Sequence, residues 1–127
     1  MFYSLRSRVL PLLSVLCLAA PLAHAQDFET LKALALMGDA EAQFEVGLIY
    51  DEDVEVPEND AQAVKWYRKA AEQGHIKAQH YLGYMYDVGE GVDTDKAEAF
   101  KWYVKAAEQG YADSQHNLGY MLSLIHI

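Results

Sequence analysis

The sequence predicts an all-α fold, an α-solenoid built from helix-turn-helix repeats. The chain repeats itself at an offset of 36 residues, and each unit contains two segments with helical spacing of apolar residues. Beyond residue 25 no alternation of apolar and polar residues typical of a strand occurs. A unit of this size cannot bury its apolar face alone, so neighbouring units are expected to share one continuous core.

The first 25 residues have the pattern of a secretory signal. Two arginines precede an apolar run that extends to Leu22, and residues 23–25 (Ala-His-Ala) match a small–x–small cleavage site. The apolar run is about 14 residues long, whereas a membrane span needs about 20. We therefore expect cleavage after Ala25 and an exported protein, periplasmic or secreted, with no stable membrane anchor after cleavage.

Charge and cysteine content exclude several classes of protein. The chain holds 10 Lys and Arg against 19 Asp and Glu, a formal charge of −9, and without the two arginines of residues 1–25 it carries −11. So acidic a chain lacks the basic surface that nucleic acids require, and we expect no nucleic-acid partner. Cys17 is the single cysteine and leaves with the signal, so the rest has neither disulfide nor thiol chemistry.

The domain boundaries follow from an ungapped alignment of the chain with itself. Residues 38–73 and 74–109 are identical at 17 of 36 positions, and residues 110–127 continue into the first helix of a third unit. A leading helix is expected over residues 26–37. The third unit stops after one helix with an atypical tail from Ser123, which makes a fragment of a longer repeat protein one alternative. The uncapped end is also a candidate for self-association.

Helix ends and close contacts are marked by particular residues within the units. Asn59 and Asp95 stand at N-cap positions, each followed three residues later by Gln or Glu, and glycines end the second helices at C′. Trp66 and Trp102 coincide at the repeat offset between alanines, which predicts core positions rather than ligand stacking. Glycines at equivalent positions of the first helices are expected to admit an aromatic ring from the adjacent helix.

One residue pattern runs through the whole second unit. It reads A-x-x-x-L-G-x-x-Y, then G-x-G-V, then D-x-x-x-A-x-x-W-Y-x-x-A-A-x-x-G. Its residues are Ala78, Leu82, Gly83, Tyr86, Gly89, Gly91, Val92, Asp95, Ala99, Trp102, Tyr103, Ala106, Ala107 and Gly110. The pattern resembles the Sel-1-like repeat family, short relatives of tetratricopeptide repeats. The resemblance covers residues 38–122, with Asp53 and Glu55 replacing the two loop glycines in the first unit.

This resemblance implies a non-enzymatic scaffold for protein–protein interaction, with envelope or host proteins as partners of exported members. In related two-helix repeats the first helices line a concave groove, and positions that differ between units are free to carry specificity. These are Phe44, Glu45 and Leu48, then His80, Tyr81 and Tyr84, then His116, Asn117 and Tyr120. Tyr and His combine rigid apolar area with a polar tip, although some of these residues could instead fill the gap between units.

No pattern for a cofactor, a metal or catalysis emerges from the sequence. Ser114 and Ser123 are the serines beyond residue 25, and neither is followed by Lys three residues later. A hydrolase, as in the cysteine-rich branch of the family, is the alternative function, but its paired cysteines are absent. His80 and His116 lie one unit apart, too far for one metal. The acidic residues 51–60 lack the EF-hand Gly and Glu, and whether they bind a cation stays open.

Overall fold

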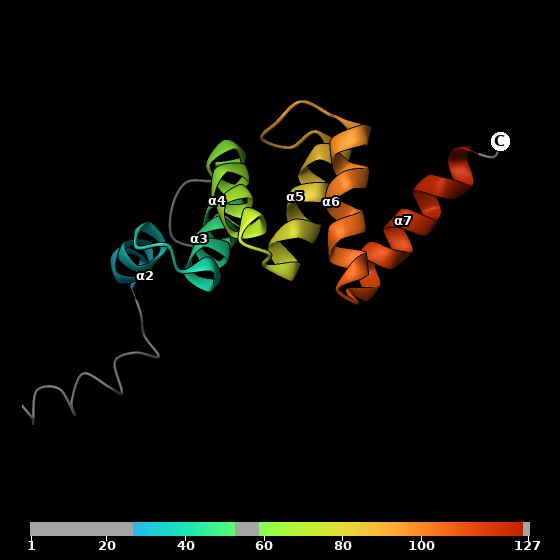
Figure 1. Ribbon diagram of the computed structural model, residues 1–127. Coiled ribbons are helices and arrows are strands. Elements are labelled where there is room, and N and C mark those ends of the chain that lie inside the picture. Colours follow the sequence, from blue (N-terminus) through green and yellow to red (C-terminus); the bar gives the residue numbers. More distant parts are fainter. Residues whose placement is uncertain (1–26, 53–58, 126–127) are drawn as a thin grey trace, which may run out of the picture. The chain divides into compact units, whose positions relative to one another are not determined.

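The structure, a computed structural model, describes residues 27–52 and 59–125, which form six α-helices and no strand (Figure 1). Their bounds are α2 Phe28–Leu36, α3 Ala40–Glu52, α4 Asp60–Glu72, α5 Ile76–Val88, α6 Lys96–Glu108 and α7 Ala112–Ile125. The chain divides into two units, Met1–Thr30 and Leu31–Ile127. In the described part of the first unit, Asp27 Oδ1 accepts the N–H of Thr30 at 2.8 Å and caps α2.

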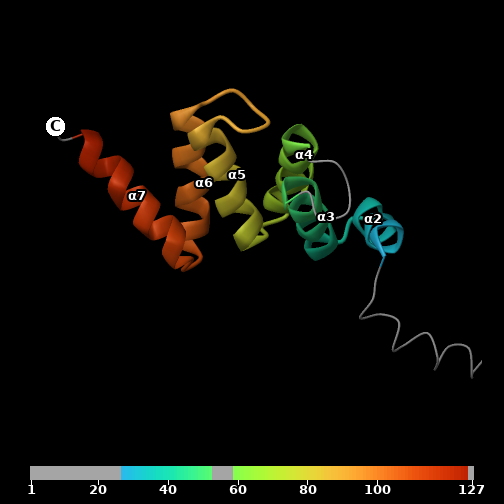
Figure 2. The same ribbon diagram turned by 180° about the vertical axis from the view of Figure 1, so that it is seen from behind.

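Within the second unit, each helix from α3 to α7 packs on the next helix in the chain. Figures 1 and 2 show α3 with α4, and α5 with α6, as two hairpins of the same form, and α7 beside α6. The periodicity of 36 residues is therefore the periodicity of a helix pair. The predicted all-α solenoid of two-helix repeats is confirmed.

The second helices begin and end at the residues that the sequence marks. The side chains of Asn59 and Asp95 accept the N–H three residues later, at 3.0 and 3.1 Å. Gly74 and Gly110 follow the same helices with φ of 92° and 89°. Glycine adopts this left-handed conformation at little cost, so the turn into the next first helix is short.

The glycines inside the first helices make room for tyrosine rings, as predicted. A Cβ on Gly47 would lie 2.6 Å from Cδ1 of Tyr67, and a Cβ on Gly83 would lie 2.9 Å from Cδ1 of Tyr103. Both tyrosines are fully buried. Because no larger residue fits between helix and ring, these two contacts set how closely α3 approaches α4 and α5 approaches α6.

The phenol ends of these tyrosines meet an acidic residue on the paired first helix. The Tyr67 hydroxyl donates to Oδ2 of Asp51 at 2.8 Å, and the Tyr103 hydroxyl lies 3.5 Å from Oδ2 of Asp87. Burial, with the Asp51 charge, raises the pKa of Tyr67, and burial raises the pKa of Tyr103 to about 12. Both phenols therefore keep their protons and remain hydrogen-bond donors.

A glutamine in the first turn of each first helix joins neighbouring units, a role that the sequence did not reveal. The side-chain amides of Gln43, Gln79 and Gln115 donate to the carbonyl eight residues earlier, at 3.0, 3.2 and 3.1 Å. Gln73 and Gln109 donate in turn to the side-chain oxygens of Gln43 and Gln79, at 2.8 and 2.7 Å. The three backbone carbonyls, which already accept the N–H of a glycine three residues later, thus receive a second bond at the end of each helix.

The tryptophans of the second helices lie in the core, as expected from their position between alanines. Trp66 and Trp102 are buried, and the ammonium groups of Lys69 and Lys105 lie 5.3 and 4.7 Å from their ring centroids. Each ammonium thus lies over a tryptophan ring, in a favourable cation–π contact.

The last helix, α7, is longer than α5, the equivalent helix of the second unit. Ser123, the first residue of the atypical tail, continues α7, which extends to Ile125. Its hydroxyl donates to the carbonyl of Tyr120 at 2.7 Å. The physical reason is that neither Gly nor Pro interrupts the chain here, so the helix does not end where the loop of the second unit begins.

Candidate protein-binding surface

The nine residues predicted to bind a partner lie on α3, α5 and α7 but differ widely in exposure. Glu45, Tyr84, His116 and Tyr120 are exposed, Leu48, His80, Tyr81 and Asn117 are half-buried, and Phe44 is buried. Equivalent sequence positions thus have unequal surroundings in the three units. The set separates into residues at the junctions between units and residues that face solvent.

Phe44 belongs to the junction between the first and second units. Its ring centroid lies 5.7 Å from that of Tyr67, 4.8 Å from His75 and 5.4 Å from Tyr81. Tyr81 also contacts Tyr67, with centroids 5.5 Å apart. These distances are typical of packed aromatic pairs. Phe44 offers no surface to a partner, and much of Tyr81 is used in holding the two units together.

His80 occupies the same place at the junction between the second and third units. Its ring lies 5.5 Å from Tyr103 and 4.9 Å from Tyr111, centroid to centroid, and Nδ1 is 2.7 Å from the hydroxyl oxygen of Ser114. Burial lowers the pKa of His80, with the Asp113 carboxylate acting in the opposite direction. His80 therefore favours its neutral form, which the Ser114 hydroxyl can pair with at Nδ1.

The contact between Ser114 and His80 places a hydroxyl beside a base, a pair that the sequence did not bring together. In a serine hydrolase such a pair must also be open to a substrate carbonyl. Ser114 is fully buried between α7 and its neighbours, with 0% of its surface exposed. A substrate could reach it only if α7 separated from the helices beneath it, so this geometry supports a packing role.

The remaining residues form what we call the first-helix surface: Glu45, Leu48, Tyr84, His116 and Tyr120. Tyr84 is 42% exposed and Tyr120 is 63% exposed, and they occupy equivalent positions one unit apart. Asn117 is half-buried, and its side chain opposes the rise in the pKa of the nearby Tyr103 hydroxyl, which makes it part of the junction. Of the predicted residues, these five leave side-chain surface accessible on the first helices, although Leu48 is half-buried against the core.

His75 is a junction residue that the sequence analysis missed. Nδ1 accepts the N–H of Ala78 at 3.1 Å and so caps α5, while Nε2 lies 2.8 Å from a carboxylate oxygen of Glu41 in the preceding unit. The neutral tautomer with its proton on Nε2 satisfies both bonds. The sequence does contain a signal for this capping role. Asp39, at the equivalent position after the glycine that opens the unit, caps α3 by accepting the N–H of Ala42 at 2.8 Å.

Two further predictions fall on residues that the structure does not describe. The secretory signal, residues 1–25, and residues 53–58 of the acidic loop lie outside the described residues. Over residues 27–52 and 59–125, no helix is both long and apolar enough to cross a bilayer. Nor do the described side chains include three or more His, Cys, Asp or Glu grouped to hold a metal ion.

Solved structures with the same helix arrangement include two repeat proteins of clear sequence similarity. A protective antigen of uropathogenic Escherichia coli strains with an SLR fold is 45% identical over 76% of this chain, with a TM-score of 0.73. A Sel1 repeat protein from Oxalobacter formigenes is 39% identical over 73% of this chain, with a TM-score of 0.72. The matched parts make up 21% and 27% of those proteins, so this chain corresponds to about a quarter of their length.

Helicobacter pylori cysteine rich protein B shares the fold alone. It is 24% identical over 72% of this chain and 68% of its own length, with a TM-score of 0.68. No curated protein sequence matches this chain.

The family assignment rests on the repeats themselves. The Sel1 repeat profile matches residues 40–75, 76–111 and 112–124, which is well over half of the chain. These matches begin where α3, α5 and α7 begin, two residues after the boundaries drawn at the glycines. With the packed glycine–tyrosine pairs and the solved relatives, they identify the chain as a member of the Sel1 repeat family.

Proposed function

We propose that this chain is an exported scaffold that binds a protein partner through the first-helix surface. Sel1 repeats form scaffolds typical of protein–protein interaction. The observation that carries the specific proposal is the contrast within each unit. Buried positions such as Trp66 and Trp102 are identical between units, whereas the first-helix position that holds Leu48 in the first unit holds an exposed tyrosine, Tyr84 or Tyr120, in the other two.

The exposed tyrosines suit a binding role for a physical reason. Tyrosine loses little conformational entropy when it is immobilised, and it offers both an apolar ring and a hydroxyl, which makes it frequent among interface anchors. Tyr84 and Tyr120 are held on rigid helices, so a partner meets a preformed surface. Glu45 adds a negative charge on α3 that favours a partner with a basic group opposite.

The test combines Glu45→Ala with Tyr84→Ala in one variant. These two side chains are exposed and lie outside the aromatic junctions, so helical content should not change. We expect the partner captured by the wild-type chain from an envelope fraction to bind this variant at least about tenfold more weakly. Affinity is then measured with the purified partner.

The matched control replaces Lys65 and Lys101 by Ala. Both are exposed, and they occupy equivalent positions on the second helices. Equal affinities of the wild type and the Glu45/Tyr84 variant would contradict a first-helix binding site. Equal losses in both variants would show that binding follows stability rather than this surface, because the two variants change the net charge in opposite directions.

Export is supported by the pattern of residues 1–25 and by the relative that is a protective antigen of uropathogenic strains. We propose an envelope or host protein as partner on this basis. Expression of the full gene in a bacterial host should yield a periplasmic or secreted product whose first residue is Gln26, as measured by intact mass. A product that keeps residues 1–25 inside the cell would refute export while leaving the scaffold proposal testable.

A further inference from the structure

Charge is divided unequally between the first and the second helices of the units. The first helices α3, α5 and α7 contain six acidic residues and a single lysine, Lys77. The second helices α4 and α6 contain six basic residues and four acidic ones. A ligand that approaches the first helices therefore meets a negative potential, which attracts a cationic group.

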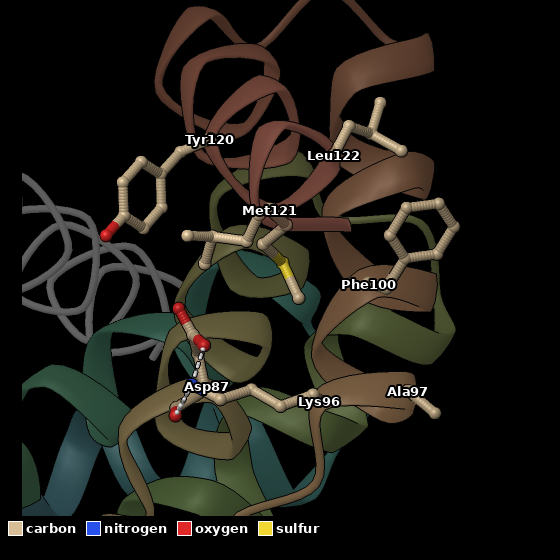
Figure 3. Close-up of a pocket in the computed structure, with 8 residues that line it drawn as sticks. Asp87, Lys96, Ala97, Phe100, Tyr120, Met121 and Leu122 are labelled. Carbon is tan, nitrogen blue, oxygen red and sulfur yellow. Dashed lines mark hydrogen bonds and ion pairs between the residues drawn. The ribbon is translucent and has the colours of Figure 1, made fainter. Parts of the chain in front are cut away.

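Most of the basic side chains on α4 and α6 already have a partner within the chain. Those with a partner are Arg68, Lys69, Lys96, Lys101 and Lys105. Figure 3 shows the pair that Lys96 forms with Asp87 on α5, at 2.6 Å. Among the described residues, Asp87 is the one carboxylate of a first helix that pairs with a lysine, so neither lysine nor arginine neutralises the others.

Two of these carboxylates lie on one face of α3. Glu45 and Glu52 are exposed, and Leu48 stands between them at spacings of three and four residues, which place all three on the same side of the helix. Within the described part of the chain, neither carboxylate accepts a side-chain hydrogen bond or forms an ion pair. Their negative charges are therefore available to a ligand at the first-helix surface.

Aromatic rings of α5 lie beside this face of α3. The ring of Tyr81 lies 5.4 Å from that of Phe44, the residue before Glu45, and 5.5 Å from that of Tyr67, centroid to centroid. Tyr84, three residues after Tyr81 on the same side of α5, is 42% exposed. The surface thus combines carboxylates on one helix with an accessible aromatic ring on the next first helix.

A guanidinium group matches both features. It forms two parallel hydrogen bonds with a carboxylate, and its flat face stacks on an aromatic ring in a cation–π contact. An ammonium group pairs with a carboxylate as a point charge and lacks this planar stacking. The first-helix surface is therefore better suited to arginine than to lysine.

We propose that the first-helix surface, together with Glu52, binds an arginine-containing segment of the partner protein. Guanidinium groups of this segment pair with Glu45 and Glu52, and one of them stacks on the ring of Tyr84. The proposal rests on the proposed function, which places a protein partner on the same surface, and it adds the chemistry of that partner. Lys77, in the first turn of α5, carries the opposing charge, so its removal gives a test in the opposite direction.

The probe is a fluorescent peptide in which Gly-Ser-Arg is repeated four times, titrated with the full chain and followed by anisotropy. The titration is made in about 0.1 M salt at about pH 8, where a histidine of ordinary pKa is neutral. We expect the same peptide with citrulline, a neutral analogue of arginine, to bind at least about tenfold more weakly. The version with lysine should bind more weakly than the arginine peptide because it retains the charge but does not stack. Equal binding of the arginine and citrulline peptides would overturn the proposal.

Two paired substitutions separate this surface from the overall charge of the chain. Glu45→Gln with Glu52→Gln removes both carboxylates and should weaken binding of the arginine peptide at least about tenfold. The matched control is Glu72→Gln with Glu108→Gln, which removes the same charge from exposed, equivalent positions of α4 and α6. The control should bind within about twofold of the wild type, because salt screens distant charges. Equal losses in the two variants would overturn the proposal, since binding would then follow net charge.

Two single substitutions on α5 test where the segment lies. Lys77→Gln removes the opposing charge and should strengthen binding by about twofold or more, and absence of any gain would contradict this placement. Tyr84→Ala should abolish the preference for the arginine peptide over the lysine peptide, whereas Tyr84→Phe, which keeps the ring, should preserve it. A preference that survives Tyr84→Ala would refute stacking on this tyrosine.

Competition with the purified partner distinguishes failure of this proposal from failure of the proposed function. We expect the arginine peptide to displace the partner and the citrulline peptide to leave it bound. A partner that loses affinity with Glu45→Ala and Tyr84→Ala, yet is not displaced by the arginine peptide, would overturn the arginine proposal while the first-helix site stands. A partner whose affinity does not change in that variant would refute the first-helix site itself, whatever the peptides do.

Discussion

The same glycine has opposite consequences in the second unit and in the third. Gly83 is buried under the ring of Tyr103, and a Cβ there would lie 2.9 Å from the ring, whereas a Cβ on Gly119 would meet nothing within 4 Å. In the second unit the missing side chain allows a helix pair to close. On α7 the glycine lowers helix stability, because glycine disfavours a helix interior, and no described residue packs into the space that its missing side chain leaves.

The junctions between units differ in a similar way. Between the first and second units, Phe44 packs on aromatic rings and the residue at the position of Ser114 is Ala78. Between the second and third units, the equivalent pair is His80 and Ser114, joined at 2.7 Å. At this pair of positions the first junction is apolar and the second contains a titratable hydrogen bond, although the backbone arrangement repeats.

The largest effect is expected from Gly47→Ala. The new Cβ would lie 2.6 Å from Cδ1 of the fully buried Tyr67, so either the ring or α3 must move. Overpacking of this kind costs about 1–3 kcal/mol of unfolding free energy, more than the helix propensity that alanine contributes. Urea denaturation followed by circular dichroism at 222 nm measures the change, and a midpoint at or above that of the wild type would contradict it.

Gly119→Ala is the same substitution at the equivalent position of α7, and it should raise the free energy of unfolding. Its Cβ meets no described atom, and alanine is favoured over glycine in a helix interior by about 1 kcal/mol. Part of this gain is lost if α7 unfolds locally before the other helices, so native-state hydrogen exchange of α7 amides is measured alongside urea denaturation. Destabilisation by Gly119→Ala would show that this side of α7 is covered in solution.

The fold could be predicted from the sequence because its determinants are local and repeated. The caps at Asn59 and Asp95 and the close approach at Gly47 and Gly83 each depend on residue types at fixed spacing. The glutamine bonds were missed although the glutamines themselves were visible. Their side-chain amides reach carbonyls eight residues earlier across a turn, and a residue pattern does not specify which of several nearby acceptors an amide meets.

The binding surface was harder to predict than the fold. Phe44 and His80 differ between units, which favoured a role in specificity, but both face the adjacent unit. Variation between units arises at junctions as well as at surfaces, since each junction can be filled by its own set of rings. Exposure, which separates Tyr84 from Phe44, depends on how the units pack and is available only from the structure.

The smallest effect concerns pH and tests the difference between the two junctions. Burial lowers the pKa of His80 below its ordinary value of about 6.5. Above that value the contribution of neutral His80 to the stability of the fold is fully present. As the pH falls through it, the unfolded chain takes up a proton at this histidine more readily than the folded chain does, so the free energy of unfolding decreases.

The variant His80→Phe with Ser114→Ala reproduces the Phe44–Ala78 pair of the first junction and removes the His80 imidazole. The other histidines and the carboxylates are common to both chains, so the difference between their urea midpoints isolates His80. We expect the wild type to lose stability relative to the variant as the pH is lowered from about 7 to about 5, and a difference that stays constant over this range would show that His80 titrates alike in the folded and unfolded chains.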